Sequence, residues 1–237
     1  MRVHLEWGPQ GARVAAGTVA VVVDVLSFTT AVSVAVDRGT EVLPHPWDGD
    51  AAALAAREGA VLASPRGATG PTLSPGSLRD LAPAPPRLVL PSPNGSRISD
   101  DLLDGGATVV AACLRNAAAV ARWITAMHPR AAVTLVPAGE RWPDDTLRPA
   151  VEDLWGAGAV AEHLGRACGA GLTPEARSAA AAWREVGSSA RDALHTCVSG
   201  LELAGMGFAG DVDVAAEVDT SEVVPVLLDG RFRGTAG

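Results

Sequence analysis

Short apolar runs alternate along the chain with longer Ala-rich segments of helical periodicity, a pattern typical of an α/β sheet whose strands are mainly parallel. The clearest predicted strands are Thr18–Val23, Arg87–Leu90, Thr108–Ala112 and Ala132–Val136. Weaker strands are predicted at Glu41–Pro44, Ala60–Ala63, Val212–Ala216 and Val223–Leu228. The predicted helices are Thr29–Arg38, Gly49–Glu58, Ile98–Asp104, Ala117–Met127, Val151–Cys168, Pro174–Glu185 and Ser189–Gly205. We therefore expect a three-layer α/β/α fold around a mainly parallel or mixed sheet.

Two long segments between these elements lack a periodic pattern. Residues Arg66–Pro86 are rich in proline and glycine and predict one long surface loop, and Gly139–Pro149 predicts a second. Long ordered loops in compact domains are often functional, so the first is expected to be either a lid over a site or plain surface. No internal repeat and no linker divides the chain, so residues 1–237 are expected to form a single domain.

Composition narrows the classes of function. All 19 basic residues are Arg, so Walker-A phosphate binding, Lys Schiff-base chemistry and the protein-kinase apparatus, which need a Lys ammonium, are excluded. The formal net charge of −8 argues against binding to nucleic acid or to anionic membranes. Three scattered cysteines predict neither a disulfide framework nor a Cys-rich metal site, and they favour a reducing, cytoplasmic setting.

One apolar run, Val14–Val36, has the length of a membrane span. Asp24 lies at its centre, and a carboxylate at the middle of a bilayer is costly. The first residues, MRVHLEWG, lack the basic-then-apolar order of a signal peptide. We therefore expect an untargeted protein that does not enter the membrane.

Polar residues follow each of the four clearest strands at its carboxyl end. They are Asp24, Ser27, Thr29 and Thr30 after the first strand, Asn94, Gly95, Ser96 and Arg97 after the second, Arg115 and Asn116 after the third, and Glu140 and Arg141 after the fourth, ahead of Glu152 and Asp153. Ligands of open α/β sheets bind where such strand ends converge, and helix N-termini favour phosphate. The carboxylates suit a hard cation such as Mg²⁺, which often shares a substrate phosphate. The pattern therefore indicates a phosphate-handling site, with Mg²⁺ as the expected cofactor.

A purely structural interpretation of these residues also stays open. Helix capping would account for Ser27, Thr29, Ser96 and Asn116. Asn94-Gly95 can form a plain turn, and acids such as Glu152 and Asp153 complement a helix dipole. Asp24 favours a functional role, because a carboxylate that ends a buried apolar strand needs a partner.

Other motif matches are weak. Gly156–Ala161 fits the dinucleotide fingerprint GxGxxA, but it lies inside a helical pattern and follows no strand, which favours helix packing. The haloacid-dehalogenase motif needs a second Asp where Leu26 stands. Cys197 with His195 has no strand–turn–helix context for nucleophilic catalysis, and the five histidines show no metal spacing.

The ordered set of motifs resembles the 2-phosphosulfolactate phosphatase family over nearly the whole chain. The matching segments are Asp24-Val25-Leu26, Thr29-Thr30, Ser92-Pro93-Asn94-Gly95-Ser96, Leu114-Arg115-Asn116-Ala117, Ala138-Gly139, Glu152-Asp153, Gly156-Ala157-Gly158, Ser199-Gly200, Gly207-Phe208, Asp211-Val212, Val218-Asp219 and Val224-Pro225. The resemblance implies a Mg²⁺-dependent enzyme that hydrolyses 2-phospho-3-sulfolactate to 3-sulfolactate and phosphate, a step of coenzyme M biosynthesis.

This chain departs from the family pattern at three places. Ser27-Phe28 stands for Arg-Ala, Ser64-Pro65-Arg66 for Gly-Glu-Arg, and Leu73-Ser74-Pro75 for Asn-Ser-Pro. Ser27 cannot replace the charge of an arginine that would clamp an anionic group. One hypothesis is that arginines of neighbouring loops compensate, namely Arg97, Arg115 and Arg141. The alternative is a phosphatase for a different, less charged phosphate ester.

Under this interpretation, Asp24 and Asp153 are the expected Mg²⁺ ligands, and Glu152 is a further ligand or proton-transfer group. The residues expected to bind a small anionic substrate are Ser27, Thr29, Thr30, Asn94, Gly95, Ser96, Arg97, Arg115 and Asn116. A phosphoenzyme on Asp24 and direct attack by water both stay open, as does a homo-oligomer. The competing hypotheses are a phosphate-binding relative without turnover and a nucleotide-dependent oxidoreductase based on Gly156–Gly158.

Overall fold

The structure is a computed structural model and describes residues 1–46, 50–169 and 171–236. Within these residues ten strands form one large sheet in the order β10-β1-β7-β2-β6-β11-β12-β3-β5-β4. The strands are β1 (Arg2–Leu5), β2 (Val19–Val23), β3 (Glu41–Pro46), β4 (Val61–Leu62), β5 (Arg87–Ser92), β6 (Thr108–Ala112), β7 (Ala132–Pro137), β10 (Gly171–Leu172), β11 (Val223–Leu228) and β12 (Arg231–Ala236). A separate pair consists of β8 (Glu140–Arg141) and β9 (Leu147–Arg148).

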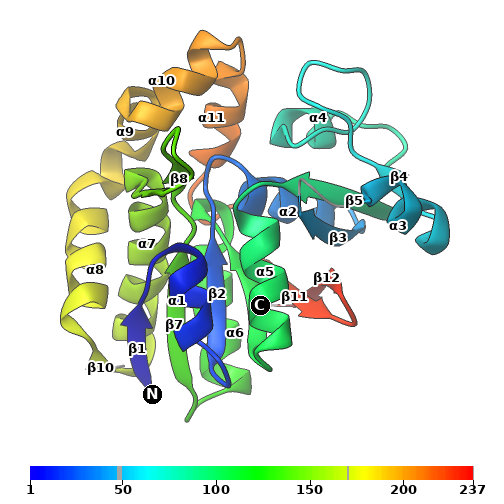
Figure 1. The fold of residues 1–237 in the computed structure, drawn as a ribbon. Coiled ribbons are helices and arrows are strands. Elements are labelled where there is room, and N and C mark those ends of the chain that lie inside the picture. Colours follow the sequence, from blue (N-terminus) through cyan, green and yellow to red (C-terminus); the bar gives the residue numbers. More distant parts are fainter. Residues whose placement is uncertain (47–49, 170, 237) are drawn as a thin grey trace.

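Helices connect most of these strands (Figure 1). They are α1 (Gly8–Val14), α2 (Phe28–Asp37), α3 (Ala51–Glu58), α4 (Pro75–Arg79), α5 (Gly95–Asp104), α6 (Ala117–Met127), α7 (Val151–Cys168), α8 (Pro174–Val186), α9 (Ala190–Thr196), α10 (Val198–Gly205) and α11 (Ala209–Ala215), with short 3-10 turns at Leu114–Asn116 and Gly187–Ser189. Among the described residues, no helix has the length and apolar character needed to cross a membrane.

The sheet consists of two parallel halves joined by an antiparallel hairpin. Strands β10, β1, β7, β2 and β6 run parallel to one another, as do β3, β5 and β4. The β11–β12 hairpin lies between the halves, antiparallel to β6 on one side and to β3 on the other. Each junction rests on one registered pair, Val226 with Val110 and Phe232 with Val42. The prediction of a mainly parallel, mixed sheet is confirmed.

The central strand β2 shows how the layers form. All five of its residues are buried, as expected of a parallel strand covered on both faces. Successive side chains point to opposite faces: Val21 and Val23 pack in the core formed with α6, α7 and α8, and Ala20 and Val22 pack in the core formed with α1, α2 and α5. The predicted three-layer α/β/α arrangement is therefore confirmed (Figure 1).

Two predicted elements near the C-terminus were wrong. The helix predicted at Ser189–Gly205 is two helices, α9 and α10, because Cys197 adopts an extended conformation between them. The strand predicted at Val212–Ala216 is the end of helix α11, whose residues Asp211, Val214 and Ala215 are buried at the i, i+3, i+4 spacing of a helix face. The Asp-Val alternation of this segment imitates a half-buried strand.

The two predicted loops contain some regular structure. The Arg66–Pro86 segment includes α4, and Gly139–Pro149 includes the β8–β9 pair. Helix α3 is described from Ala51, and residue 49 of the predicted Gly49–Glu58 helix lies outside the described residues. Both segments lie at the end of the sheet at which β2 and β7 point, where α10 and α11 also lie (Figure 1).

Candidate active site

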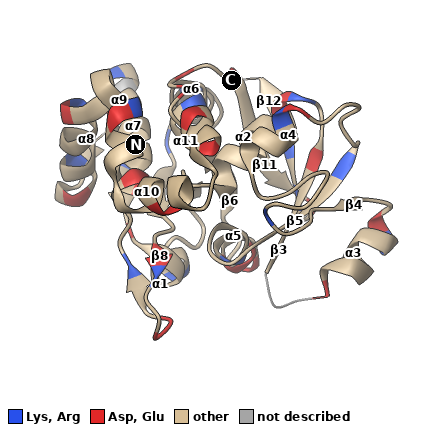
Figure 2. Cartoon of the chain, turned by 90° about the horizontal axis from the view of Figure 1, so that it is seen from above, with Lys and Arg blue, Asp and Glu red and all other residues tan. Residues whose placement is uncertain are grey.

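A cavity of about 260 Å³ lies where the carboxyl ends of β2 and β5 meet α10. Figure 2 looks onto the end of the molecule at which these strands point, where α5, β8 and α10 lie near one another. The cavity is lined by Asp24, Leu26, Ser27, Arg66, Leu73, Ser92, Pro93, Asn94, Glu140, Ser199, Glu202, Leu203 and Met206. Its walls thus come from both halves of the sheet and from the C-terminal helices. Polar and charged side chains dominate the set, which suits a charged ligand.

Asp24 is fixed at the centre of this arrangement. Its Oδ1 accepts a hydrogen bond from the Phe28 N–H (3.1 Å) at the start of α2, and its Oδ2 accepts one from the Gly95 N–H (3.1 Å) at the start of α5. The Thr29 hydroxyl donates to the Asp24 carbonyl oxygen (2.8 Å) and accepts from the Asp24 N–H (3.0 Å). The carboxylate is therefore oriented by backbone groups from both halves of the sheet.

Gly95 is required for this close approach. A Cβ atom at this position would lie 2.3 Å from Cδ1 of Phe28 and 2.9 Å from Oδ2 of Asp24. Both distances are shorter than side-chain atoms tolerate. The Asn94-Gly95 sequence, which also fits a plain turn, therefore brings the start of α5 against the Asp24 carboxylate.

Three further carboxyl groups lie close enough to Asp24 for the charges of the four groups to influence one another. Asp153 at the start of α7 is buried and accepts hydrogen bonds from the Val25 N–H (2.7 Å) and the Gly139 N–H (2.8 Å). Glu152 is also buried, and Glu140 lines the cavity. We call Asp24, Glu140, Glu152 and Asp153 the acidic cluster.

Burial and mutual repulsion weaken the acidity of this cluster. Burial raises the pKa of Asp24 to about 6, with a smaller contribution from Glu152. Burial, followed by the charges of Asp24 and Glu152, raises the pKa of Glu140 to about 7. The same causes, in the same order, raise the pKa of Asp153 well above its usual range. Burial and repulsion thus disfavour the ionised forms of these carboxyl groups unless positive charge lies beside them.

The carboxylate oxygens of the acidic cluster are of the kind that a hard divalent cation such as Mg²⁺ prefers as ligands. Across residues 1–46, 50–169 and 171–236, no group of three His, Cys, Asp or Glu side chains is arranged to hold a metal by itself. Mg²⁺ sites commonly use one or two carboxylates and complete their shell with water and substrate phosphate. Each carboxylate oxygen of Asp24 and Asp153 accepts one backbone N–H, which leaves a lone pair for a further partner.

Arg66 supplies positive charge at the cavity. Its Nη2 donates to the Ser27 hydroxyl oxygen (2.6 Å), and its Nη1 pairs with the buried carboxylate of Asp211. The guanidinium also lies 5.3 Å from the ring centre of Phe208. The arginine from the 64–74 segment therefore stands beside Ser27, the position at which the family pattern has an arginine of its own.

The structure brings some of the predicted substrate-binding residues to the cavity. Ser27 and Asn94 line it, and the Gly95 N–H faces Asp24 within it. Asn94 donates from Nδ2 to Glu140 (3.0 Å) and accepts at Oδ1 from Arg141 (3.2 Å). These residues connect the acidic cluster to the neighbouring loops.

Four other predicted residues instead hold the backbone from fully buried positions. The hydroxyls of Thr29, Thr30 and Ser96 donate to backbone carbonyl oxygens, and the Asn116 side chain accepts from the Cys113 N–H and donates to the Ala111 carbonyl oxygen. Their side chains lie in the strand-to-helix turns and do not line the cavity. These contacts stabilise the turns, but they are not the predicted helix caps: Ser27 precedes α2 and Asn116 precedes α6, and neither side chain makes a capping hydrogen bond to its helix.

The two predicted arginines lie outside the Asp24 cavity. Arg97 is exposed and, with Arg141, lines a neighbouring cavity. Arg115 is buried, donates to Asp37 (2.9 Å) and also pairs with Glu217. Arg97 and Arg115 therefore make their contacts away from the Asp24 cavity, whereas Arg66 lines it and Arg141 contacts Asn94 of its wall.

The sequence patterns do not predict a role for several residues of the site. Arg66 lies in an altered family motif and Glu140 in a strand-end loop, and neither pattern places the residue at the cavity. Ser199 and Asp211 lie in the C-terminal motifs that carry the family resemblance, which was the one signal that pointed to them. They approach the cavity through long-range packing that no local pattern predicts.

Gly156 and Gly158 serve helix packing. They lie within α7, where a Cβ at Gly158 would be 2.1 Å from the Ala179 carbonyl oxygen and a Cβ at Gly156 would be 2.7 Å from side-chain carbons of Val23 and Val25. They let α7 pack tightly against α8 and β2, and they lie inside the helix rather than in the strand-to-helix turn of a dinucleotide-binding motif.

Comparison with known proteins identifies relatives of this chain. Residues 9–230 match the family described as 2-phosphosulpholactate phosphatase, a range that includes every residue of the Asp24 cavity. A relative from Deinococcus radiodurans, named probable 2-phosphosulfolactate phosphatase, is 33% identical over 222 residues, which cover 90% of this chain and 88% of the relative. The chain belongs to the 2-phosphosulpholactate phosphatase family and is a phosphoric monoester hydrolase.

Proposed function

We propose that this chain is a Mg²⁺-dependent phosphatase that hydrolyses a small anionic phosphate monoester at the Asp24 cavity, with 2-phospho-3-sulfolactate as the first substrate to test. The products would be 3-sulfolactate and inorganic phosphate. The observation that carries the proposal is the buried Asp24 carboxylate, held by two backbone N–H groups and facing both an acidic cluster and the Arg66 guanidinium. The names of the family and of the relative support the substrate.

Asp24 and Asp153 are the residues that would hold Mg²⁺, because backbone N–H groups fix both carboxylates, Asp24 lines the cavity, and the charges of the two groups interact. When bound, the ion neutralises charge on phosphoryl oxygens and orients a water molecule. Asp24 is also correctly fixed to act as a nucleophile. Attack by its carboxylate and attack by water differ in whether a phosphoenzyme forms on Asp24.

The substrate's anionic groups would contact Arg66 and Ser27. The Ser27 oxygen accepts from Arg66, so its own hydroxyl proton remains available for a phosphate oxygen. Arg66 provides the charge-assisted hydrogen bonds that an exposed anion would otherwise make to water. Together they provide local hydrogen-bond donors to an anionic substrate, which the overall charge of −8 repels at long range.

Glu140 is placed to move a proton. It lines the cavity, receives a hydrogen bond from Asn94, and has a pKa of about 7, so it exchanges protons at neutral pH. Protonated, it can donate to the departing alkoxide of the ester; ionised, it can accept a proton from attacking water. This assigns to Glu140 the proton-transfer role that the sequence suggested for Glu152, which is buried and does not line the cavity.

Phosphate release from 2-phosphosulfolactate and from a panel of phosphate esters, with Mg²⁺ and with EDTA, tests the proposal. We expect release that requires Mg²⁺, that EDTA abolishes reversibly, and that Asp24→Asn lowers by at least about a thousandfold. Asp192→Asn, an exposed acid on α9, is the matched control and should retain full activity. Folded wild-type protein that releases no phosphate from any ester with Mg²⁺ would refute the proposal.

A further inference from the structure

A second and larger cavity adjoins the first. Its volume is about 580 Å³, more than twice the 260 Å³ of the Asp24 cavity. It is lined by Ala51, Leu62, Ala63, Ser64, Pro65, Arg66, Leu73, Pro91 and Pro93. Three of these residues, Arg66, Leu73 and Pro93, also line the Asp24 cavity, so the two spaces share a wall.

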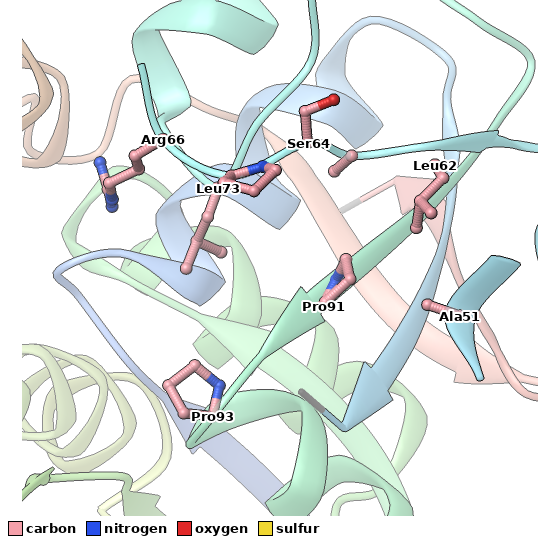
Figure 3. Close-up of a pocket in the computed structure, with 9 residues that line it drawn as sticks. Ala51, Leu62, Ser64, Arg66, Leu73, Pro91 and Pro93 are labelled. Atoms are coloured by element: carbon pink, nitrogen blue, oxygen red, sulfur yellow. The ribbon is translucent and has the colours of Figure 1, made fainter. Parts of the chain in front are cut away.

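The second cavity is apolar. Seven of its lining residues are Ala, Leu or Pro. Figure 3 shows the Arg66 guanidinium and the Ser64 hydroxyl pointing away from the centre, whereas Leu62, Leu73 and Pro91 surround it. The polar ends therefore leave an apolar interior, unlike the charged Asp24 cavity next to it.

The walls of this cavity are held in place by contacts outside it. Strand β4 pairs with β5 through Leu62 and Val89, and the Ser64 N–H donates to the Pro71 carbonyl oxygen (2.8 Å). Arg66 is tied to Asp211, which also holds the start of α4 through the Gly76 N–H (3.3 Å). A cavity that exists before ligand binding loses little free energy to ordering when a ligand enters.

We infer that this cavity binds an apolar group, so that the site also takes phosphate monoesters whose alcohol carries an apolar chain or ring of several carbons. The inference rests on the function proposed for the Asp24 cavity, which would hold the phosphate. A ligand with its phosphate at Arg66 and Ser27 reaches the second cavity past Leu73 and Pro93, the shared wall. A three-carbon acid with charged groups on every carbon presents no apolar surface to this space, which would stay filled with water.

Binding of two phosphonates separates this inference from turnover. Methylphosphonate and n-hexylphosphonate carry the same charged group, and hydrolysis cannot consume them. Each CH₂ buried from water strengthens binding about fourfold, so partial burial of the chain predicts that hexylphosphonate binds roughly 10- to 100-fold more tightly in calorimetry with Mg²⁺ present. In parallel, phosphate release is measured from hexyl phosphate and methyl phosphate.

Pairs of matched variants test whether the tighter binding of hexylphosphonate depends on the apolar cavity. Leu62→Asn replaces an apolar wall with an amide, and Val61→Asn makes the same change at the next residue of β4, which is 43% exposed and does not line the cavity. Ala51→Phe fills the cavity from α3, and Ala52→Phe adds the same bulk at the neighbouring exposed position. Leu62→Asn and Ala51→Phe should remove most of the hexyl advantage, whereas both control variants should keep it. Thermal unfolding of each variant confirms that it is folded.

Equal affinity for the two phosphonates, or an advantage that survives both cavity variants, would overturn the inference. A monomer–dimer equilibrium that Leu62→Asn weakens, with no preference for the hexyl compound, would assign the cavity to a second copy and also overturn it. A hexyl advantage lost in the cavity variants, with no release of phosphate from any ester, 2-phosphosulfolactate included, would support the apolar site and refute the proposed phosphatase instead.

Discussion

Arg66 has two roles: it pairs with the buried Asp211 carboxylate, which stabilises the fold, and it would bind the anionic substrate at the cavity. Replacing Arg66 with methionine, alone and together with a change at Asp211, lets the two effects be measured separately. The Asp211 carboxylate that it pairs with is only 4% exposed. Removing one partner of a buried ion pair costs about 3–5 kcal/mol, because the other charge is left uncompensated. Asp211 keeps hydrogen bonds from the Ser74 hydroxyl and the Gly76 N–H, so we expect Arg66→Met to lower the free energy of unfolding by about 2–3 kcal/mol.

The same substitution removes the guanidinium from the cavity. A hydrogen bond to a charged group contributes about 1.5–3 kcal/mol, which corresponds to a loss of roughly 10- to 150-fold in kcat/KM. A second substitution, Asp211→Asn, removes the buried charge that Arg66→Met leaves behind. The double variant should therefore regain stability in urea unfolding but stay as inactive as Arg66→Met in phosphate release.

Arg66→Lys is the conservative comparison. An ammonium keeps the charge but lacks the fork that contacts Ser27 and Asp211 at once, so we expect partial recovery of stability and little recovery of activity. If Asp211→Asn restored the activity of Arg66→Met, the role of Arg66 at the cavity would be structural only. Unchanged kcat/KM in a folded Arg66→Met variant would refute the reasoning altogether.

Further predictions concern the turn at Asp24 and one acid outside the site. Gly95→Ala places a methyl group against Phe28 and the Asp24 carboxylate, and should cost about 1–3 kcal/mol in urea unfolding and lower kcat as the carboxylate shifts. Gly158→Ala should destabilise to a similar degree but leave kcat unchanged in the folded fraction, because α7 and α8 meet there away from the cavity. Burial raises the pKa of Asp100 to about 6 from 3.8, so its ionised form disfavours folding. Stability therefore falls as pH rises from about 4 to 6, and Asp100→Asn should gain about 1 kcal/mol at pH 7.5, after allowance for solvent screening, and nothing below pH 4. Equal unfolding free energies for Asp100→Asn and wild type at pH 7.5 would contradict the prediction for Asp100. If Gly95→Ala or Gly158→Ala were as stable as wild type, the prediction for that glycine would be wrong.

Sequence patterns predicted the buried strands and the covered helices better than the short or half-polar strands. Strand β6 and helices α6 and α7 have their predicted bounds, because a buried parallel strand reads as a continuous apolar run and a covered helix shows a clear period. Strands β1 and β12 were not predicted. They are short or half-polar, as the RFRGTA sequence of β12 shows, and pairing with neighbours rather than local preference makes them strands.

The candidate site divides in the same way. Asp24 was predicted because a carboxylate at the end of a buried strand is conspicuous in the sequence, and the placement of Asp153 beside it follows from parallel strands meeting at one edge. Arg66 could not be predicted from its own loop, since its contacts, Ser27 and Asp211, lie far from it in the chain. Thr29 and Asn116 match the motif equally well but stabilise turns, and only their hydrogen bonds reveal this.

The β11–β12 hairpin has a consequence for how the enzyme becomes active as it folds. It joins the sheet halves by pairing residue 226 with residue 110 and residue 232 with residue 42, contacts between segments remote in sequence. Such contacts form slowly, because closing a long loop costs conformational entropy before the contact that it allows can stabilise the chain. The walls of the Asp24 cavity come from both halves, so neither half can assemble the cavity alone. During refolding, recovery of phosphate release should therefore lag behind the return of helical circular dichroism and coincide with the last step of tertiary structure formation.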